Sequence, residues 1–199
     1  MDDIVKQAMA KWPNVPYCYG WLALDARGNW RMRDEHAQRN GLPGDKLANA
    51  ALVGFIARNY QRDERGCWYF QNGPQRVYVN LEATPFIART DPAHGFVLHT
   101  GAPLANVEAA WITEAGELVL QAGGIVAQLD DRDVAQALDA VEADGQRVGD
   151  EALLAWLGGG GALAAPTLNV SGSSVPLRKM DRGAIADRFG FRKAPTPAG

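Results

Sequence analysis

A short turn sequence between two alternating segments constrains the fold more than any other feature of this chain. The turn is Asp25-Ala26-Arg27-Gly28, and residues 20–24 and 29–33 flank it. Alternating segments joined by such an Asp and Gly turn are typical of a β-hairpin. Because successive side chains of a strand lie on opposite faces, we expect one face of the hairpin to carry Leu22, Leu24, Trp30 and Met32.

A second segment shows the same pattern. Residues 111–120 align with residues 23–32 without a gap, and Gly116 stands where the first turn has Gly28. The second segment therefore predicts another hairpin with the same turn. Further alternating segments lie after each hairpin, and they predict additional strands.

An amphipathic helix follows each predicted hairpin, and the residues between the first hairpin and its helix, 34–44, are polar and predict a loop. The first helix covers residues 47–60 with Asp45 as its N-cap. The second helix carries Val134, Leu138 and Val141, and its N-cap is Asp130 or Asp131. The pattern predicts an α+β fold of two repeated β-hairpin–helix–strand units. These units form one or more antiparallel sheets, with the helices packed on one face.

Proline and glycine positions suggest how the chain is divided. Pro13 and Pro16 lack an amide donor, so they end the helix that begins near residue 3. The predicted parts are an N-terminal helix with an extended Trp-Pro segment, a first repeat, a second repeat with a C-terminal helix, and a disordered tail rich in Pro, Ala and Gly. Their ranges are 1–16, 17–100, 107–192 and 193–199.

Charge and hydropathy argue against two classes of function. The formal net charge is −3, and no run of five like charges occurs, whereas nucleic-acid-binding proteins usually carry a basic excess. The apolar stretch at residues 50–57 is far shorter than the roughly 20 residues of a membrane span. The first residues are acidic, unlike those of a secretory signal. We therefore predict a cytoplasmic protein that binds neither nucleic acid nor membrane.

The cysteine and histidine positions do not match a metal or catalytic motif. Cys18 and Cys67 have no CxxC partner, and His36, His94 and His99 are not spaced as ligands on one helix face. Motifs of serine hydrolases, zinc peptidases and dinucleotide-binding proteins are absent from the sequence. We predict two reduced thiols, no metal, no cofactor and no catalytic residue. A hydrolase or transferase that uses Cys18 or Cys67 with His36 or His99 remains an alternative.

The opposite face of the first hairpin is the candidate binding surface. Arginine binds carboxylates and phosphates through paired N–H groups and stacks on aromatic rings, so such a face suits an anionic or planar ligand. A later strand adds to this face if the register brings both strands into one sheet. The predicted ligand-binding residues are Trp21, Arg31, Arg33, Arg76 and Tyr78.

Three other uses of this face remain open. The arginines could pair across strands with acidic residues such as Asp34, Glu35 and Glu82. The face could be buried against the second repeat, or it could contact another protein, because Trp, Tyr and Arg are frequent at interface hot spots.

Two longer runs resemble a known family. Residues 11–25 and 68–79 are similar to an uncharacterised proteobacterial family and, more distantly, to the bacterial domain-of-unknown-function family 1285. The resemblance covers about residues 17–130, and it implies an α+β fold with repeated motifs and a role in signalling or ligand sensing. It brings no catalytic residues, and neither the N-terminal Trp-Pro segment nor the region after residue 145 has a counterpart in it. The shorter matching runs are Gly28-Asn29-Trp30, Leu52-Val53-Gly54-Phe55, Gly66-Cys67-Trp68-Tyr69, Gly73-Pro74-Gln75-Arg76-Val77-Tyr78-Val79 and Thr84-Pro85-Phe86.

These observations favour a non-catalytic binding or regulatory module of the bacterial cytoplasm. Its predicted partner is a small anionic ligand or another protein. The two alternatives are the cysteine-dependent enzyme and a structural adaptor subunit. The sequence leaves the ligand, the partner and the oligomeric state open.

Overall fold

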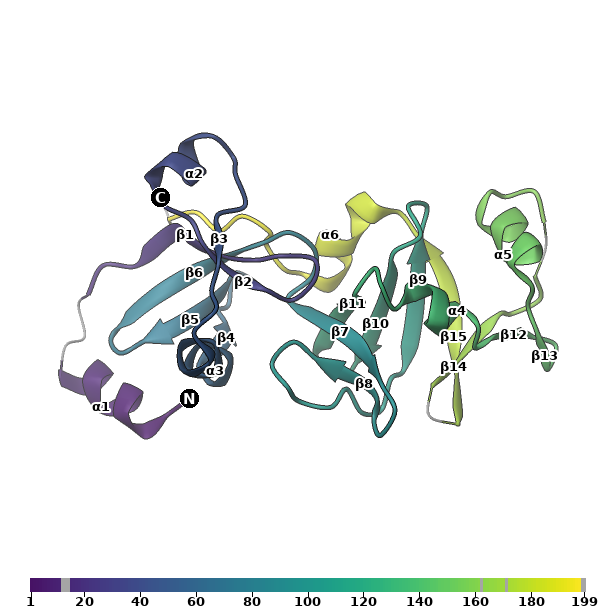
Figure 1. Cartoon of the computed structure of the whole chain (residues 1–199), viewed down its shortest axis with the longest axis horizontal. Coiled ribbons are helices and arrows are strands. Elements are labelled where there is room, and N and C mark those ends of the chain that lie inside the picture. The colour runs from purple at the N-terminus through teal and green to yellow at the C-terminus, as the bar shows by residue number, and fades with distance from the viewer. Residues whose placement is uncertain (12–14, 162, 171, 198–199) are drawn as a thin grey trace. The chain divides into compact units, whose positions relative to one another are not determined.

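The computed structural model describes residues 1–11, 15–161, 163–170 and 172–197. Two compact units share the chain: the first contains Met1–Pro85 with Phe189–Gly199, and the second contains Phe86–Arg188. Each unit is built on one large sheet (Figure 1). None of the helices in the described ranges has the length and apolar character of a membrane span.

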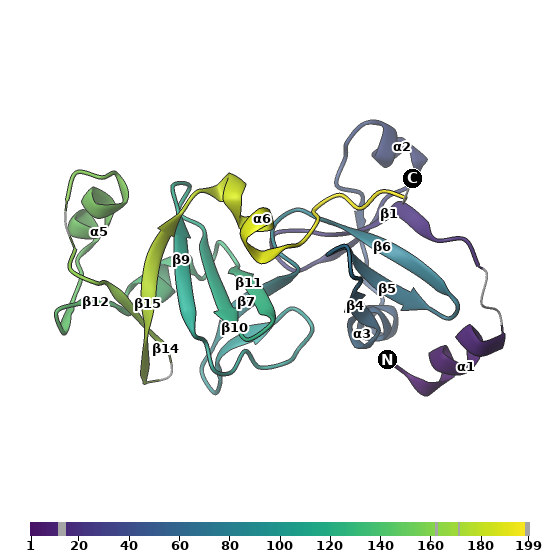
Figure 2. The same cartoon turned by 180° about the vertical axis from the view of Figure 1, so that it is seen from behind.

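The first unit is a six-stranded sheet with three helices. Its strand order is β3-β2-β1-β6-β5-β4, and β1 and β6 pair in parallel. In both views α3 lies beside β4 and β5 (Figure 1, Figure 2). The elements are α1 (Asp3–Lys11), β1 (Cys18–Leu24), β2 (Trp30–Met32), α2 (Glu35–Arg39), β3 (Asp45–Lys46), α3 (Ala50–Arg58), β4 (Tyr60–Arg62), β5 (Trp68–Asn72) and β6 (Gln75–Leu81).

The second unit is a nine-stranded sheet with short helices. Its strand order is β13-β12-β14-β15-β9-β10-β11-β7-β8. Its elements are β7 (Phe86–Asp91), β8 (Gly95–Leu98), β9 (Ala109–Thr113), β10 (Leu118–Ala122), β11 (Ile125–Leu129), α4 (Val134–Leu138), β12 (Val141–Ala143), β13 (Gln146–Arg147), α5 (Asp150–Leu157), β14 (Thr167–Val170), β15 (Ser173–Met180), the 3₁₀-helix η1 (Arg182–Ala184) and α6 (Ile185–Phe189).

Both predicted hairpins form, and they pair in corresponding register. Leu24 pairs with Trp30 in the first, and Ile112 pairs with Leu118 in the second. Each turn has a glycine with positive φ, 77° at Gly28 and 80° at Gly116, a conformation that glycine adopts without steric cost. The wider prediction of two repeated hairpin–helix–strand units stays a prediction.

The sheets are mixed, so the prediction of purely antiparallel sheets is wrong. The parallel pairs are β1 with β6, β7 with β11, and β9 with β15. A parallel pair requires a long crossover connection, and the chain between β1 and β6 supplies one with β2 to β5. The predicted first unit at residues 17–100 includes β7 and β8, whereas the pairing of β7 with β11 places them in the second sheet.

Two helix boundaries in the first unit differ from the predictions. The predicted loop at residues 34–44 contains α2, because the Asp34 carboxylate accepts the Ala37 N–H at 2.8 Å and so caps a helix. The N-cap of α3 is Asn49, which accepts the Leu52 N–H at 3.0 Å, and not Asp45. Asp45 is instead part of β3, since it pairs with Met32.

The helix predicted in the second unit is shorter than expected. Its N-cap is Asp133, not Asp130 or Asp131, and the helix ends at Leu138. Val141 belongs to strand β12 and pairs with Leu168. A β-branched residue suits a strand better than a helix, and here a partner strand distant in the sequence was available.

Parts of the predicted N-terminal segment and of the predicted C-terminal tail lie outside the described residues. Trp12, Pro13 and Asn14 of the predicted extended segment lie outside the described residues, as do Ala198 and Gly199 of the predicted tail. Within the tail, the Lys193 carbonyl accepts the Leu81 N–H at 2.8 Å, and the Thr196 carbonyl accepts an N–H of Arg65 at 3.2 Å.

Candidate functional site

The five predicted ligand-binding residues lie in three places of the first unit. Arg31 and Arg33 line a cleft of about 420 Å³. Arg76 and Tyr78 belong to a cluster of tyrosines. Trp21 lines a separate cleft of about 320 Å³. The sheet therefore does not gather all five residues into one site.

The larger cleft combines apolar walls with several charged side chains. We call it the polar cleft. It lies where β1, β2 and β6 meet the loop at residues 41–43 and the C-terminal segment at residues 193–194. Its polar side chains are Asp25, Arg31, Arg33, Asn80, Glu82 and Lys193.

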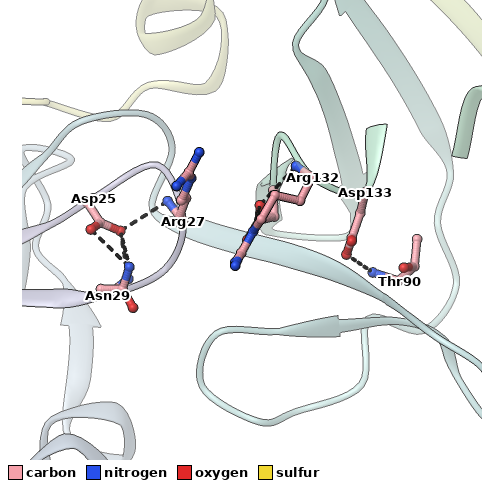
Figure 3. Close-up of polar contacts among 7 residues, drawn as sticks. Asp25, Arg27, Asn29, Thr90, Arg132 and Asp133 are labelled. Carbon is pink, nitrogen blue, oxygen red and sulfur yellow. Dashed lines mark hydrogen bonds and ion pairs between the residues drawn. The ribbon is translucent and has the colours of Figure 1, made fainter. Parts of the chain in front are cut away.

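Asp25 organises the turn at one end of the polar cleft. Its carboxylate accepts the Asn29 N–H at 2.8 Å, the Arg27 N–H at 3.0 Å and the Arg31 Nε–H at 2.7 Å. Two further contacts from the Asn29 side chain complete the set (Figure 3). Burial acts to raise the pKa of Asp25, but these hydrogen bonds outweigh it and hold the pKa below its usual range. Asp25 is therefore ionised and has little remaining capacity to accept.

Arg33 keeps hydrogen-bonding capacity in the polar cleft, whereas Glu82 and Lys193 make contacts with the turn and with each other. Arg33 donates from Nε to the Leu42 carbonyl at 3.1 Å, and its two terminal nitrogens have no hydrogen bond to another described residue. The Glu82 carboxylate accepts the Ala26 N–H at 3.0 Å. Lys193 donates to the Glu82 carbonyl at 3.2 Å. The cleft is thus lined by three cationic side chains and two carboxylates. The carboxylate of Asp25 already accepts hydrogen bonds from Arg31 and from the turn backbone.

Arg31 is held in place by contacts within the first unit. Besides the contact with Asp25, its Nη1 donates to the Gly44 carbonyl at 3.1 Å. Its ion pair with Asp25 is largely shielded, with 26% of the Arg31 side chain and 9% of the Asp25 side chain exposed. The alternative of cross-strand pairing is thus realised for Arg31, with Asp25 as the partner and not Asp34, Glu35 or Glu82.

Arg76 and Tyr78 occur on the same sheet as Arg31, in a cluster that is closed by its own contacts. The Tyr78 ring stacks on Tyr19 with centroids 4.5 Å apart, and its hydroxyl donates to Asp63 at 3.0 Å. Arg76 lies 4.6 Å from the centre of the Tyr69 ring. Because Tyr78 is only 1% exposed, a ligand would have to displace these contacts to reach it.

Strand alternation predicts Trp21 and Leu22 on opposite faces of the sheet, but the structure places them at the same cleft. Strand β1 shifts its register against β6 between Cys18 and Leu22, and this irregularity accounts for the position of Trp21.

Of the residues of the enzyme alternative, Cys18 lines the same cleft as Trp21, Cys67 is buried, His36 lies on α2, and His99 belongs to the second unit. Burial raises the pKa of the Cys18 and Cys67 thiols, which disfavours a thiolate at neutral pH. His99 accepts the Ile87 N–H at 3.2 Å in the second unit, and burial lowers its pKa to about 4. Within the described residues, no group of three or more His, Cys, Asp or Glu side chains could hold a metal ion.

Two residues of the first unit, Asp63 and Lys193, were not among the predicted site residues, although the sequence around Asp63 contains a recognisable turn pattern. Asp63 starts the run Asp63-Glu64-Arg65-Gly66, which repeats the Asp-x-Arg-Gly pattern of the first turn. Its carboxylate accepts the Cys67 N–H at 2.9 Å, as Asp25 accepts that of Asn29. Lys193 had no such signal, because it reaches the polar cleft from the far end of the chain.

The second unit has polar contacts of its own. Asp133 accepts the Thr90 N–H at 2.8 Å (Figure 3). Asp130 is fully buried and accepts from Arg132, and this contact lowers the pKa of Asp130 to about 2. These carboxylates serve local backbone and ion-pair contacts, so they do not form a second candidate site.

Two solved structures are similar to this chain. A DUF1285 family protein from Silicibacter pomeroyi DSS-3 has a TM-score of 0.49 and 17% sequence identity, and the match covers 89% of this chain and 95% of that chain. A DUF1285 family protein from Shewanella baltica OS155 has a TM-score of 0.39 and 16% identity, and covers 56% of this chain and 85% of that chain. The predicted distant similarity to family 1285 is confirmed.

The chain matches a protein family over nearly its whole length. None of the curated proteins matches this chain. One family profile matches residues 1–196, which is nearly the whole sequence. The chain therefore belongs to the family DUF2944, whose description is "Protein of unknown function (DUF2946)".

Proposed function

We propose that this protein is a non-catalytic binding module that takes up a small anionic molecule in the polar cleft. The observation that carries the proposal is the balance of charge and hydrogen-bonding capacity there. Arg31, Arg33 and Lys193 face Asp25 and Glu82, and Asp25 already accepts from Arg31 and the turn backbone. The terminal nitrogens of Arg33 are the donors best placed to receive an added carboxylate or phosphate.

The size and walls of the polar cleft narrow the ligand class. A volume of about 420 Å³ lies within the range of small-molecule sites. Leu42, Pro43 and Leu81 supply apolar wall. The best-fitting ligand is therefore a small molecule with one anionic group and a short apolar part. A cytoplasmic location and a role in signalling are parts of this proposal, and they rest on the sequence predictions above.

A cysteine-dependent enzyme is not part of the proposal. An activated thiol needs a lowered pKa, whereas burial raises the pKa of both Cys18 and Cys67.

A thermal-shift screen of small carboxylates and phosphates tests the proposal. A ligand present at 100 times its dissociation constant stabilises the folded state by about 2.7 kcal/mol, which gives a clear shift in melting temperature. We expect Arg33→Gln to abolish the shift caused by a bound anion. The matched control is Arg178→Gln, which makes the same change at an exposed strand position of the second unit.

Three outcomes would count against this proposal. The first is the absence of any shift across the screen. The second is an equal shift in wild type and Arg33→Gln, which would show that the anion binds elsewhere. The third is equal loss of the shift in Arg33→Gln and Arg178→Gln, which would indicate a nonspecific charge effect.

A further inference from the structure

A second cleft of the first unit has no charged residue in its lining. We call it the apolar cleft. It lies between α3 and the sheet, and its volume is about 320 Å³. Its side chains include Cys18, Trp21, Met32, Leu52, Phe55 and Phe70. It shares no lining residue with the polar cleft, so an inference about it is independent of the proposed function.

A β-bulge in strand β1 forms part of one wall of the apolar cleft. Between Cys18 and Leu22 strand β1 advances four positions, while its partner advances only two, from Val77 to Val79. Gly20 lies inside this bulge with a φ of 82°. The bulge brings Trp21 to the same side as Leu22, and bulges often redirect a side chain in this way next to functional sites.

Helix α2 closes over the bulge. Gln38 of α2 donates from Nε2 to the Arg33 carbonyl at 3.0 Å. A Cβ at Gly20 would lie only 2.5 Å from the Gln38 Oε1 atom. The local structure that positions Trp21 therefore needs both a glycine and a neighbouring helix.

Large apolar side chains are exposed at this cleft. Trp21 is 40% exposed, Met32 42% and Leu52 38%. Met32 was predicted to be part of the core, but it lies at the rim of the cleft instead. Exposed apolar side chains are ordinary when they are scattered, but a contiguous group around a cavity indicates a binding site.

We infer that the apolar cleft binds an uncharged, flat aromatic molecule of about two fused rings. An apolar cavity of roughly 150 Å³ accommodates benzene, so a cleft of about 320 Å³ has room for about two rings. Trp21, Phe55 and Phe70 supply ring faces and edges for aromatic contacts. The flexible thioether of Met32 can adapt to the ligand. The lack of a charged lining residue disfavours an ionised ligand, which would lose its hydration without gaining a partner.

The test is a ligand-observed NMR titration of the full chain with 2-naphthol, which is uncharged at neutral pH. We expect saturable binding to wild type. The variant Leu52→Arg places a cation at the rim and should weaken binding at least tenfold. Arg and Leu have similar helix propensities and Leu52 is partly exposed, so the variant should fold. The matched control, Leu154→Arg, makes the same change at a 67% exposed position of α5 and should bind as wild type does.

Each other result overturns the inference. It is wrong if 2-naphthol does not bind wild type, or if Leu52→Arg binds it unchanged. Equal binding of 1-decanol, a linear uncharged probe, would exclude the preference for flat aromatic molecules. Circular dichroism monitors the fold of Leu52→Arg. If that variant unfolds, Leu52→Gln replaces it, and the same loss of binding is required.

Discussion

The hairpin turns of the two units have the same backbone hydrogen bonds but differ in charge. In the first, the Asp25 N–H donates to the Asn29 carbonyl at 3.1 Å, and in the second, the Thr113 N–H donates to the Glu117 carbonyl at 2.9 Å. The side chain at the first position accepts the N–H of the fifth in both turns, at 2.8 Å for Asp25 and 3.1 Å for Thr113. Either a carboxylate or a hydroxyl therefore satisfies the turn.

The difference lies in what the charge of Asp25 adds. Asp25 also accepts from Arg31, and both residues line the polar cleft. Thr113 is fully buried, and its hydroxyl donates to Glu117 at 3.0 Å. The turn therefore needs an acceptor and a glycine, whereas the charge of Asp25 adds an ion pair with Arg31 beside the polar cleft.

The largest expected effect concerns the glycine of these turns. Gly66 of the related Asp63 turn and Gly116 have nearly equal φ values, 79° and 80°. A Cβ at Gly116 meets no atom within 4 Å, so Gly116→Ala should cost about 1–2 kcal/mol for the left-handed conformation alone. A Cβ at Gly66 would lie 2.2 Å from the Gly190 carbonyl oxygen, so Gly66→Ala should cost on the order of 3 kcal/mol or more.

Urea denaturation of the two variants measures this difference. Equal costs would contradict the packing of the Gly190 segment against the Asp63 turn. A larger cost for Gly116→Ala would contradict it as well, because both glycines have the same backbone conformation and only Gly66 has this close contact.

The next effect concerns the acceptor at the first position of the turn. Asp25→Asn keeps an acceptor but removes the charge, and we expect a loss of about 2 kcal/mol in the free energy of unfolding, because hydrogen bonds to a charged group are the stronger ones. Thr113→Val keeps the shape of the side chain but removes a hydroxyl that accepts the Glu117 N–H and donates to the Glu117 side chain, and it should cost about 1 kcal/mol. Chemical denaturation at neutral pH gives both values. A greater loss for Thr113→Val would show that the charge of Asp25 does not stabilise its turn.

The smallest expected effect is the pH dependence of the stability difference between wild type and Asp25→Asn. The pKa of Asp25 is lower in the folded protein than its usual value, so its stabilisation is present above the unfolded pKa of about 3.9 and is lost as the pH falls through the folded pKa. We therefore expect the stability gap between wild type and Asp25→Asn to shrink from about pH 6 to about pH 3. A constant gap for Asp25→Asn would show that the folded and unfolded pKa values are equal.

The sequence determined the hairpins of both units. Each depends on residues within about ten positions of one another: an acceptor side chain, a glycine with positive φ, and alternating flanks. Physical rules for turns act over this distance, so the register of Leu24 with Trp30 could be predicted without the rest of the chain. The same local logic identified Arg31 and Arg33 as residues of a polar surface.

How these local elements combine into candidate sites depends on contacts between distant parts of the chain. The parallel pairing of β1 and β6, the arrival of Lys193 at the polar cleft and the turning of Trp21 into the apolar cleft all join residues that are distant in the sequence. A strand pattern shows that a face exists but not which strand lies beside it, because pairing is set by the combined burial of many side chains. For this reason the sequence predicted that one face of the first sheet carries arginine and aromatic side chains. It did not predict that these side chains divide among the polar cleft, the apolar cleft and the tyrosine cluster.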